Sequence, residues 1–147
     1  YGRFCLNDKD QNARYILIAT GTGVTPYRAM LPQLKQLMDS RGVEVVLLFG
    51  ARSEEDLIYR EDFYKFAEDN PKFRFMPAFS RKLPENPTAD ARTGYVQDQL
   101  AELAPNGAHD IAYLCGNPNM VDACFEALKE FGLSVHHIRR EKYVSSK

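Results

Sequence analysis

The length, composition and charge of the chain limit its class before any motif is considered. A chain of 147 residues with 44% hydrophobic and 27% charged residues fits one globular domain around one core. The formal net charge of −1 gives no reason to expect binding to nucleic acid or to a membrane surface. No run approaches the roughly 20 apolar residues of a membrane span.

Cysteine and histidine spacing argues against a disulfide framework and against a metal site. The cysteines are odd in number and widely spaced, and no C-x-x-C, H-E-x-x-H or i, i+4 histidine pair occurs. These residues are Cys5, Cys115, Cys124, His109, His136 and His137. We therefore expect no metal ion and a reducing, cytoplasmic location.

The ends of the chain differ in character from its middle. Residues 1–12 begin with two aromatic residues in a polar segment and are predicted to be the remnant of an interdomain connection. Residues 13–138 are predicted to form a pyridine-nucleotide-binding domain, and residues 139–147 a polar C-terminal tail.

The first predicted unit is a strand, a glycine turn and a helix. Residues 15–19 are apolar throughout, as is typical of a strand covered on both faces. Residues 20–26 contain two glycines followed by Thr25 and Pro26, which suit the N-cap and first position of a helix. Residues 27–38 have apolar side chains at helical spacing, although Pro32 predicts a kink or a division into two helices.

Further strands and helices alternate along the rest of the chain. The predicted strands are 43–49, 73–79, 111–115 and 133–138, and the predicted helices are 61–68, 95–103 and 118–131. Alternation of this kind indicates βαβ units with parallel strands. We therefore expect an α/β fold, a three-layer doubly wound sheet of five parallel strands in the order 3-2-1-4-5 with helices on both faces.

Several strand ends carry residues suited to a nucleotide. The turn at Gly21 is a candidate phosphate site, because backbone N–H groups and a helix N-terminus attract anions. It is neither a G-x-G-x-x-G fingerprint nor a P-loop, and a tight turn with no ligand is the alternative. Arg52, Ser80 and Arg81 follow the next two strands and favour a 2′-phosphate, although surface loops commonly carry arginine.

The fourth strand ends in Cys115-Gly116-Asn117-Pro118, a second glycine turn into a helix. No Lys, Arg or His in this turn activates Cys115, so packing against a ligand is favoured over a covalent role. Gly116 would allow a flat ring to approach the backbone.

Five motifs in order along the chain resemble the C-terminal pyridine-nucleotide domain of the ferredoxin–NADP reductase family. They are Gly-Thr-Gly-Val-Thr-Pro at 21–26, Phe-Gly-Ala-Arg at 49–52, Asp56-Leu57-x-Tyr59, Ser80-Arg81, and Cys-Gly-Asn-Pro-x-Met at 115–120. The resemblance implies the NADP-binding half of a flavoprotein oxidoreductase. Such an enzyme transfers hydride between NADPH and FAD and exchanges electrons with ferredoxin or flavodoxin.

The resemblance also implies roles for individual residues. Ser80 and Arg81 would hold the 2′-phosphate with Arg52 nearby, and Tyr95 would stack on adenine, with simple packing at a helix start as the alternative. Cys115 would be the catalytic residue that faces the nicotinamide. The remaining implied cofactor-binding residues are Gly21, Thr22, Gly23, Val24, Thr25, Pro26, Gly116, Asn117, Pro118 and Met120.

The family's flavin motifs, an Arg-x-Tyr-Ser strand and a glycine-rich phosphate turn, do not occur in this sequence. FAD would therefore be bound mainly by a domain absent from this chain, which is expected to bind nucleotide without turning over. Whether Glu141 or Tyr143 contacts the nicotinamide or the flavin is left open.

Other functions were weighed against this interpretation. An NADH-dependent reductase component of an oxygenase, with an iron–sulfur domain elsewhere, is the nearest alternative. A receiver domain would need acidic residues at the strand ends, where Thr20, Gly21 and Ser80 stand instead. A binding subunit without catalytic activity is the third possibility.

Overall fold

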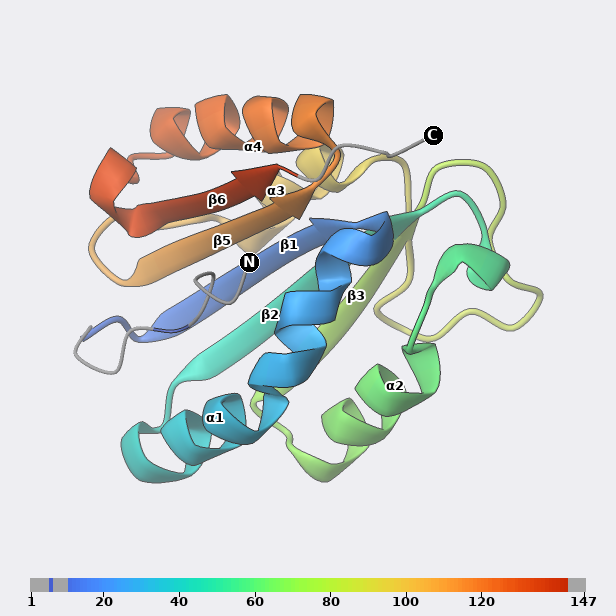
Figure 1. Ribbon diagram of the computed structural model, residues 1–147, viewed down its shortest axis with the longest axis horizontal. Helices are drawn as coiled ribbons and strands as arrows, with labels where there is room; N and C mark the ends of the chain where they lie inside the picture. Colours follow the sequence, from blue (N-terminus) through green and yellow to red (C-terminus); the bar gives the residue numbers. More distant parts are fainter. Residues whose placement is uncertain (1–5, 7–10, 143–147) are drawn as a thin grey trace.

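A computed structural model of the chain describes Leu6 and residues 11–142, which form a parallel sheet between two layers of helices (Figure 1). The six strands lie in the order β4-β3-β2-β1-β5-β6, and every neighbouring pair is parallel. Their bounds are β1 Arg14–Thr20, β2 Glu44–Ala51, β3 Phe73–Phe79, β4 Arg92–Thr93, β5 Asp110–Gly116 and β6 Ile138–Lys142.

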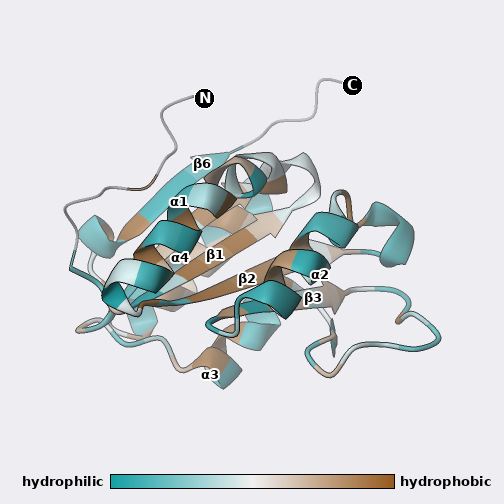
Figure 2. Ribbon diagram, turned by 90° about the horizontal axis from the view of Figure 1, so that it is seen from below, coloured by the Kyte–Doolittle hydropathy of each residue, from teal (hydrophilic) through white to brown (hydrophobic). Residues whose placement is uncertain are grey.

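The helices cover both faces of the sheet (Figure 2). Helices α1 (Thr25–Arg41) and α2 (Arg60–Asp69) pack on one face, and α3 (Leu100–Leu103) and α4 (Pro118–Glu130) pack on the other. The 3₁₀ segments are η1 Gly21–Val24, η2 Glu54–Asp56, η3 Val96–Gln99 and η4 Val135–His137.

Alternating strand residues supply the two cores. In β1, Tyr15, Leu17 and Ala19 belong to the α1–α2 core, whereas Ile16 and Ile18 belong to the opposite core. All five side chains are fully buried. A strand covered on both faces needs no polar alternation, which explains why it could be predicted from an unbroken apolar run.

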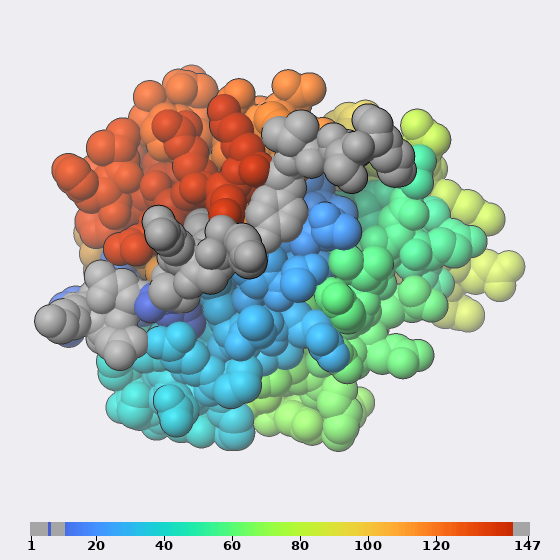
Figure 3. All heavy atoms as spheres, viewed as in Figure 1, coloured from blue at the N-terminus to red at the C-terminus, as the bar shows by residue number. Residues whose placement is uncertain are grey.

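Helices α1 and α2 also contact each other over their face of the sheet. In the space-filling view their atoms adjoin (Figure 3), and Arg28 Nε lies 2.6 Å from Asp62 Oδ2 across the contact. Both of these side chains are about half exposed, so the ion pair contributes little to stability.

The predicted α/β class and the order of the five long strands are confirmed, but the predicted number of strands is wrong. The sixth strand is β4, a two-residue edge strand beside β3 that is too short to produce a hydrophobic pattern. The predicted strand 133–138 is also misplaced: Ser134, Val135 and His136 are exposed, and the strand in this region is β6.

The bounds of β6 differ from the predicted ones because this strand carries charged side chains at the edge of the described sheet. Its sequence is Ile-Arg-Arg-Glu-Lys, with only Ile138 fully buried. The guanidinium of Arg140 lies over the ring of Phe125 in α4 and makes a cation–π contact, with its Cζ 3.8 Å from the ring centroid. Residues 139–142, expected to belong to a tail, are therefore part of the sheet.

Three further expectations need correction or fall outside the described residues. Helix α1 runs unbroken through Pro32, so the division into two helices does not occur. The predicted helix 95–103 is a 3₁₀ segment, η3, followed by the short α3. Most of the predicted interdomain connection, residues 1–12, lies outside the described part of the chain, as does Tyr143.

Candidate nucleotide-binding site

A groove of about 1450 Å³ runs along the carboxyl ends of the strands. This is the edge where parallel α/β sheets bind ligands, at the point where the strand order reverses between β1 and β5. The polar and glycine residues among its lining are Thr20, Gly21, Thr22, Gly50, Arg52, Glu55, Asp56, Ser80, Gly94, Tyr95, Gln97, Gly116, Asn117, Asn119, Glu141 and Lys142.

The two glycine turns at the centre of the groove are joined by a hydrogen bond. The backbone N–H of Asn117 donates to Thr20 Oγ1 at 3.0 Å. Gly116 has φ +142°, and a Cβ there would lie 2.5 Å from the same Thr20 Oγ1. Only glycine therefore allows the end of β5 to approach the end of β1 this closely.

Gly21 and Gly23 have different roles in the first turn. Gly21 has φ +55° and open space where a Cβ would point, and it lines the groove together with Thr22. Gly23 is buried, and a Cβ there would lie 2.4 Å from the carbonyl oxygen of Cys115. Gly21 therefore leaves room for a ligand, whereas Gly23 lets the turn pack against β5.

The start of α1 differs in detail from the prediction. The turn is a 3₁₀ segment, and the N-cap of α1 is Val24 rather than Thr25. Pro26 lies within the first two helical positions, as expected. Val24, Thr25 and Pro26 do not line the groove. The residues of this motif that do line it are Gly21 and Thr22.

The start of α4 fits its prediction. Pro118 lies within the first two helical positions, and Asn117 is the N-cap, its side-chain oxygen accepting from Asn119 N at 2.8 Å and Met120 N at 3.2 Å. Asn117, Pro118 and Met120 line the groove, and their contact with a cofactor stays a prediction. A helix N-terminus thus faces the groove beside Gly116.

At the far end of the groove, Arg52 forms an ion pair with Asp56. Its Nε lies 2.8 Å from Asp56 Oδ2, and its side chain is 64% exposed. The hydrogen bond from Arg52 is the main cause of a lowered pKa at Asp56. The same hydrogen bond raises the pKa of Arg52, so both groups are charged at neutral pH.

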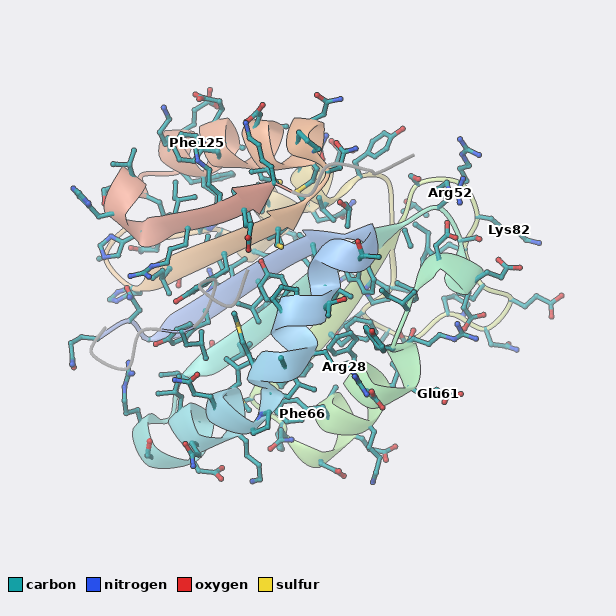
Figure 4. The ribbon with its side chains drawn as sticks, viewed as in Figure 1. Arg28, Arg52, Glu61, Phe66, Lys82 and Phe125 are labelled. Carbon is teal, nitrogen blue, oxygen red and sulfur yellow. The ribbon has the colours of Figure 1, made fainter. Side chains whose placement is uncertain are left out.

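Neighbouring residues in the same loops form a compact polar cluster. Ser53 Oγ lies 2.7 Å from Glu55 Oε1, and this hydrogen bond is the main cause of a lowered pKa at Glu55. The backbone N–H groups of Arg81 and Lys82 donate to the carbonyl oxygen of Arg52 at 3.1 and 3.0 Å. The loops after β2 and β3 therefore meet, and Figure 4 shows Arg52 and Lys82 together at this corner.

Ser80 and Tyr95 line the groove on this side, whereas the exposed side chain of Arg81 is not part of its wall. Tyr95 is 62% exposed, which is unusual for an aromatic residue whose role is packing at a helix start. The backbone N–H of Tyr95 donates to Asp98 Oδ2 at 3.2 Å at the start of η3, and the exposed ring offers a surface to a ligand.

Cys115 is fully buried and does not line the groove. Its side chain belongs to the α1–α2 core together with Ala19 and Tyr27, while the adjacent Gly116 forms the groove wall. The role of Cys115 beside a nicotinamide stays a prediction. Cys124 is also buried, and burial raises the pKa of its thiol to about 12.

Sequence reasoning missed several groove residues. Thr20 carries a detectable signal, since it is a hydroxyl residue between a buried strand and a glycine turn. Asp56 lies four positions after Arg52, a spacing typical of an ion pair. Lys142 carries no local signal, because its placement opposite Gly116 depends on the pairing of β6 with β5. Glu141, already a candidate for contact with the nicotinamide or the flavin, lines the groove opposite Cys115 in the same pairing.

The described part of the chain shows neither a metal site nor a membrane-spanning helix. Among these residues, no group of three or more His, Cys, Asp or Glu side chains is arranged to hold a metal ion. None of the described helices has the length and apolar composition needed to cross a membrane.

Comparison with known proteins identifies the class to which this fold and groove belong. The sequence profile of the family described as oxidoreductase NAD-binding domain matches residues 17–126, and the chain belongs to that family. The resemblance to ferredoxin–NADP reductases is confirmed: the chain is 34% identical to ferredoxin–NADP reductase B of Sorangium cellulosum, over 92% of this chain and 57% of the relative.

Two further similar proteins carry different names. The phenol hydroxylase P5 protein of Acinetobacter pittii is 36% identical and matches 99% of this chain with 40% of its own length. The crystal structure of an Amycolatopsis cytochrome P450 reductase superposes with a TM-score of 0.82 at 33% identity, over all of this chain and 43% of that chain. This chain thus spans about half or less of these relatives.

Proposed function

We propose that this chain is the NADP(H)-binding half of a flavoprotein oxidoreductase. The observation that carries the proposal is the continuous groove from Ser80 and Arg52, past the first glycine turn, to Gly116. Bound there, NADPH would supply a hydride to FAD, which a separate domain would hold. The chain's own contribution is to bind and orient the nucleotide.

The residues of the groove fit a dinucleotide. The turn at Gly21 leaves open space beside its backbone, and the Asn117 cap holds the start of α4 at the opposite wall. Anionic phosphates suit this centre because the N-terminus of α4 faces it beside the open backbone of Gly21. The exposed ring of Tyr95 offers a surface on which adenine would stack.

Ser80 and Arg81 support NADP over NAD. Ser80 lines the groove, and Arg81 is exposed immediately after it, in a loop that also holds Lys82. A hydroxyl and a guanidinium are suitable donors to a 2′-phosphate, whereas a ribose 2′-hydroxyl is usually bound by an acid. Electrons would then pass to ferredoxin or flavodoxin, the partners of the reductase family that the motifs resemble.

An NADH-dependent reductase component of an oxygenase is the second candidate. The relative named phenol hydroxylase P5 protein favours it, and so does the acidic turn Glu54–Asp56 beside the groove. The spacing of the cysteines also supports a cytoplasmic location for either enzyme.

Calorimetric titration with NADP⁺ and NAD⁺ distinguishes these candidates. We expect tighter binding of NADP⁺, and a selective loss of NADP⁺ affinity in Arg81→Ala. Equal affinities, or an Arg81→Ala chain that binds NADP⁺ as well as the original, would rule out the 2′-phosphate assignment. Failure to bind either nucleotide would rule out the proposed function.

A further inference from the structure

We propose that Asp56 is a specificity-determining residue, a built-in competitor for Arg52, the cation that would assist Ser80 and Arg81 in binding the 2′-phosphate. The carboxylate of Asp56 lines the groove and pairs with Arg52 before any ligand arrives. It therefore reduces the preference for NADP over NAD. This inference rests on the proposed function only in requiring that a nicotinamide nucleotide binds in the groove.

The geometry of the pair makes Asp56 a rival to a bound phosphate. Arg52 Nε donates to Asp56 Oδ2 at 2.8 Å, and the second guanidinium nitrogen lies 3.4 Å from Oδ1. This two-point contact resembles the way that a guanidinium binds a phosphate. A phosphate that reaches Arg52 must therefore displace Asp56 or accept a carboxylate beside it.

The surrounding charges favour competition. The exposed cations at this corner are Arg52, Arg81 and Lys82, and the carboxylates that line the groove beside them are Glu55 and Asp56. Arg81 contributes to the field that keeps Asp56 ionised, and Lys82 acts on Glu55 in the same way. Each carboxylate thus offsets positive charge that a dianionic phosphate would otherwise meet.

The opposite role for Asp56 makes a different prediction. If Asp56 positioned Arg52 for the phosphate, its removal would weaken the binding of NADP⁺. If it competes, removal strengthens binding. The 64% exposure of Arg52 favours competition, because a side chain so accessible is free to turn between two acceptors.

Four variants of the chain separate these roles: Asp56→Asn, Arg52→Gln, the double variant, and Asp62→Asn as the matched control. Asp62 also pairs with an exposed arginine, at 2.6 Å from Arg28 Nε, but neither residue lines the groove. Its substitution removes the same charge from the chain as Asp56→Asn. Dissociation constants for NADP⁺ and NAD⁺ are measured by calorimetry, at low salt and at 1 M NaCl.

We expect Asp56→Asn to bind NADP⁺ about three- to tenfold more tightly and NAD⁺ within about twofold of the original chain. Arg52→Gln should lose NADP⁺ affinity by a similar factor, and the double variant should return close to the original, because the removed charges are opposite. These differences should shrink at 1 M NaCl, and Asp62→Asn should show none.

Weaker NADP⁺ binding by Asp56→Asn, or an equal change for both nucleotides, would overturn the inference and leave the proposed function standing. In the second case the ratio of the NADP⁺ and NAD⁺ affinities would be the same in Asp56→Asn as in the original chain. If the original chain bound neither nucleotide, the proposed function itself would fail. Circular dichroism of each variant establishes that it is folded before titration.

Discussion

Replacing Gly23 by alanine tests whether contact between the first turn and β5 builds the groove. A Cβ at this position would lie 2.4 Å from Cys115 O, 2.6 Å from Cys115 C and 2.7 Å from Gly116 Cα. All three atoms are backbone, so no side chain can rotate away. Ordinary contact begins at 3.4 Å, and the turn and β5 must therefore separate by about 1 Å.

The cost of that separation follows from the behaviour of overpacked cores. Inserting a methyl group into a well-packed site typically costs about 1–3 kcal/mol. Three rigid neighbours place Gly23→Ala near 3 kcal/mol, which is within the roughly 5–15 kcal/mol that holds a domain folded. We therefore expect a folded protein whose free energy of unfolding is lowered and whose nucleotide site is distorted.

Urea denaturation and nucleotide titration measure the two effects. With an m-value of about 2 kcal/mol/M, the midpoint should fall by about 1.5 M, and affinity for NADP⁺ should fall as well. Gly42→Ala is the control, because Gly42 has φ +69° at the end of α1, open space around it and no part in the groove. That variant should lose about 1 kcal/mol and retain its affinity. A Gly23→Ala chain with unchanged midpoint and unchanged affinity would refute the reasoning.

Two further predictions concern ion pairs away from the groove. Glu102 Oε2 lies 2.5 Å from Arg92 Nη2, and this hydrogen bond is the main cause that lowers the pKa of Glu102 to about 2. The pair therefore stabilises the fold fully above about pH 4.5, and this stabilisation is lost as the pH falls towards 2. Glu102→Gln should cost about 1 kcal/mol at pH 7 in urea denaturation, and a difference that stays constant down to pH 2 would contradict this. Asp110 is buried and lies 2.7 Å from Arg14, so Asp110→Ala should cost about 3 kcal/mol. Asp62→Ala, at an exposed pair, should cost no more than about 0.5 kcal/mol by the same measurement, and equal losses would argue against the burial effect.

Sequence periodicity was sufficient for the parts of the fold whose side chains are apolar on both sides. The predicted bounds of β1 and β5, residues 15–19 and 111–115, agree with the structure within two residues. Both faces of these strands are covered by a core, so the sequence needs an unbroken run of apolar side chains there. The bounds of β6 could not be found this way. Its arginines are accommodated by local partners such as the ring of Phe125, a contact that depends on how α4 lies beside the strand.

The candidate site shows the same division. Gly21, Ser80 and Asn117 could be placed at the carboxyl edge of the sheet from the sequence, because each lies in a turn that follows a parallel strand. Their contacts with a cofactor stay a prediction. The separate role of Gly23 could not be predicted, since its neighbours are backbone atoms about ninety positions away along the chain. Pairing of Arg52 with Asp56 was predictable from spacing, but its position inside the groove was not.

The position of β1 in the middle of the sheet also has a consequence for the order of folding. Its pairing with β2 brings together nearby segments, Arg14 opposite Glu44, whereas its pairing with β5 joins Arg14 to Asp110, 96 positions later. Closing the longer loop costs more chain entropy, so we expect β5 to dock after β1, β2 and β3 have assembled. Because the first glycine turn and Gly116 lie on opposite sides of this seam, nucleotide binding should appear only with the last kinetic phase of refolding. Stopped-flow refolding in the presence of NADP⁺ measures when nucleotide binding appears, and binding before the last phase would contradict this order of strand docking.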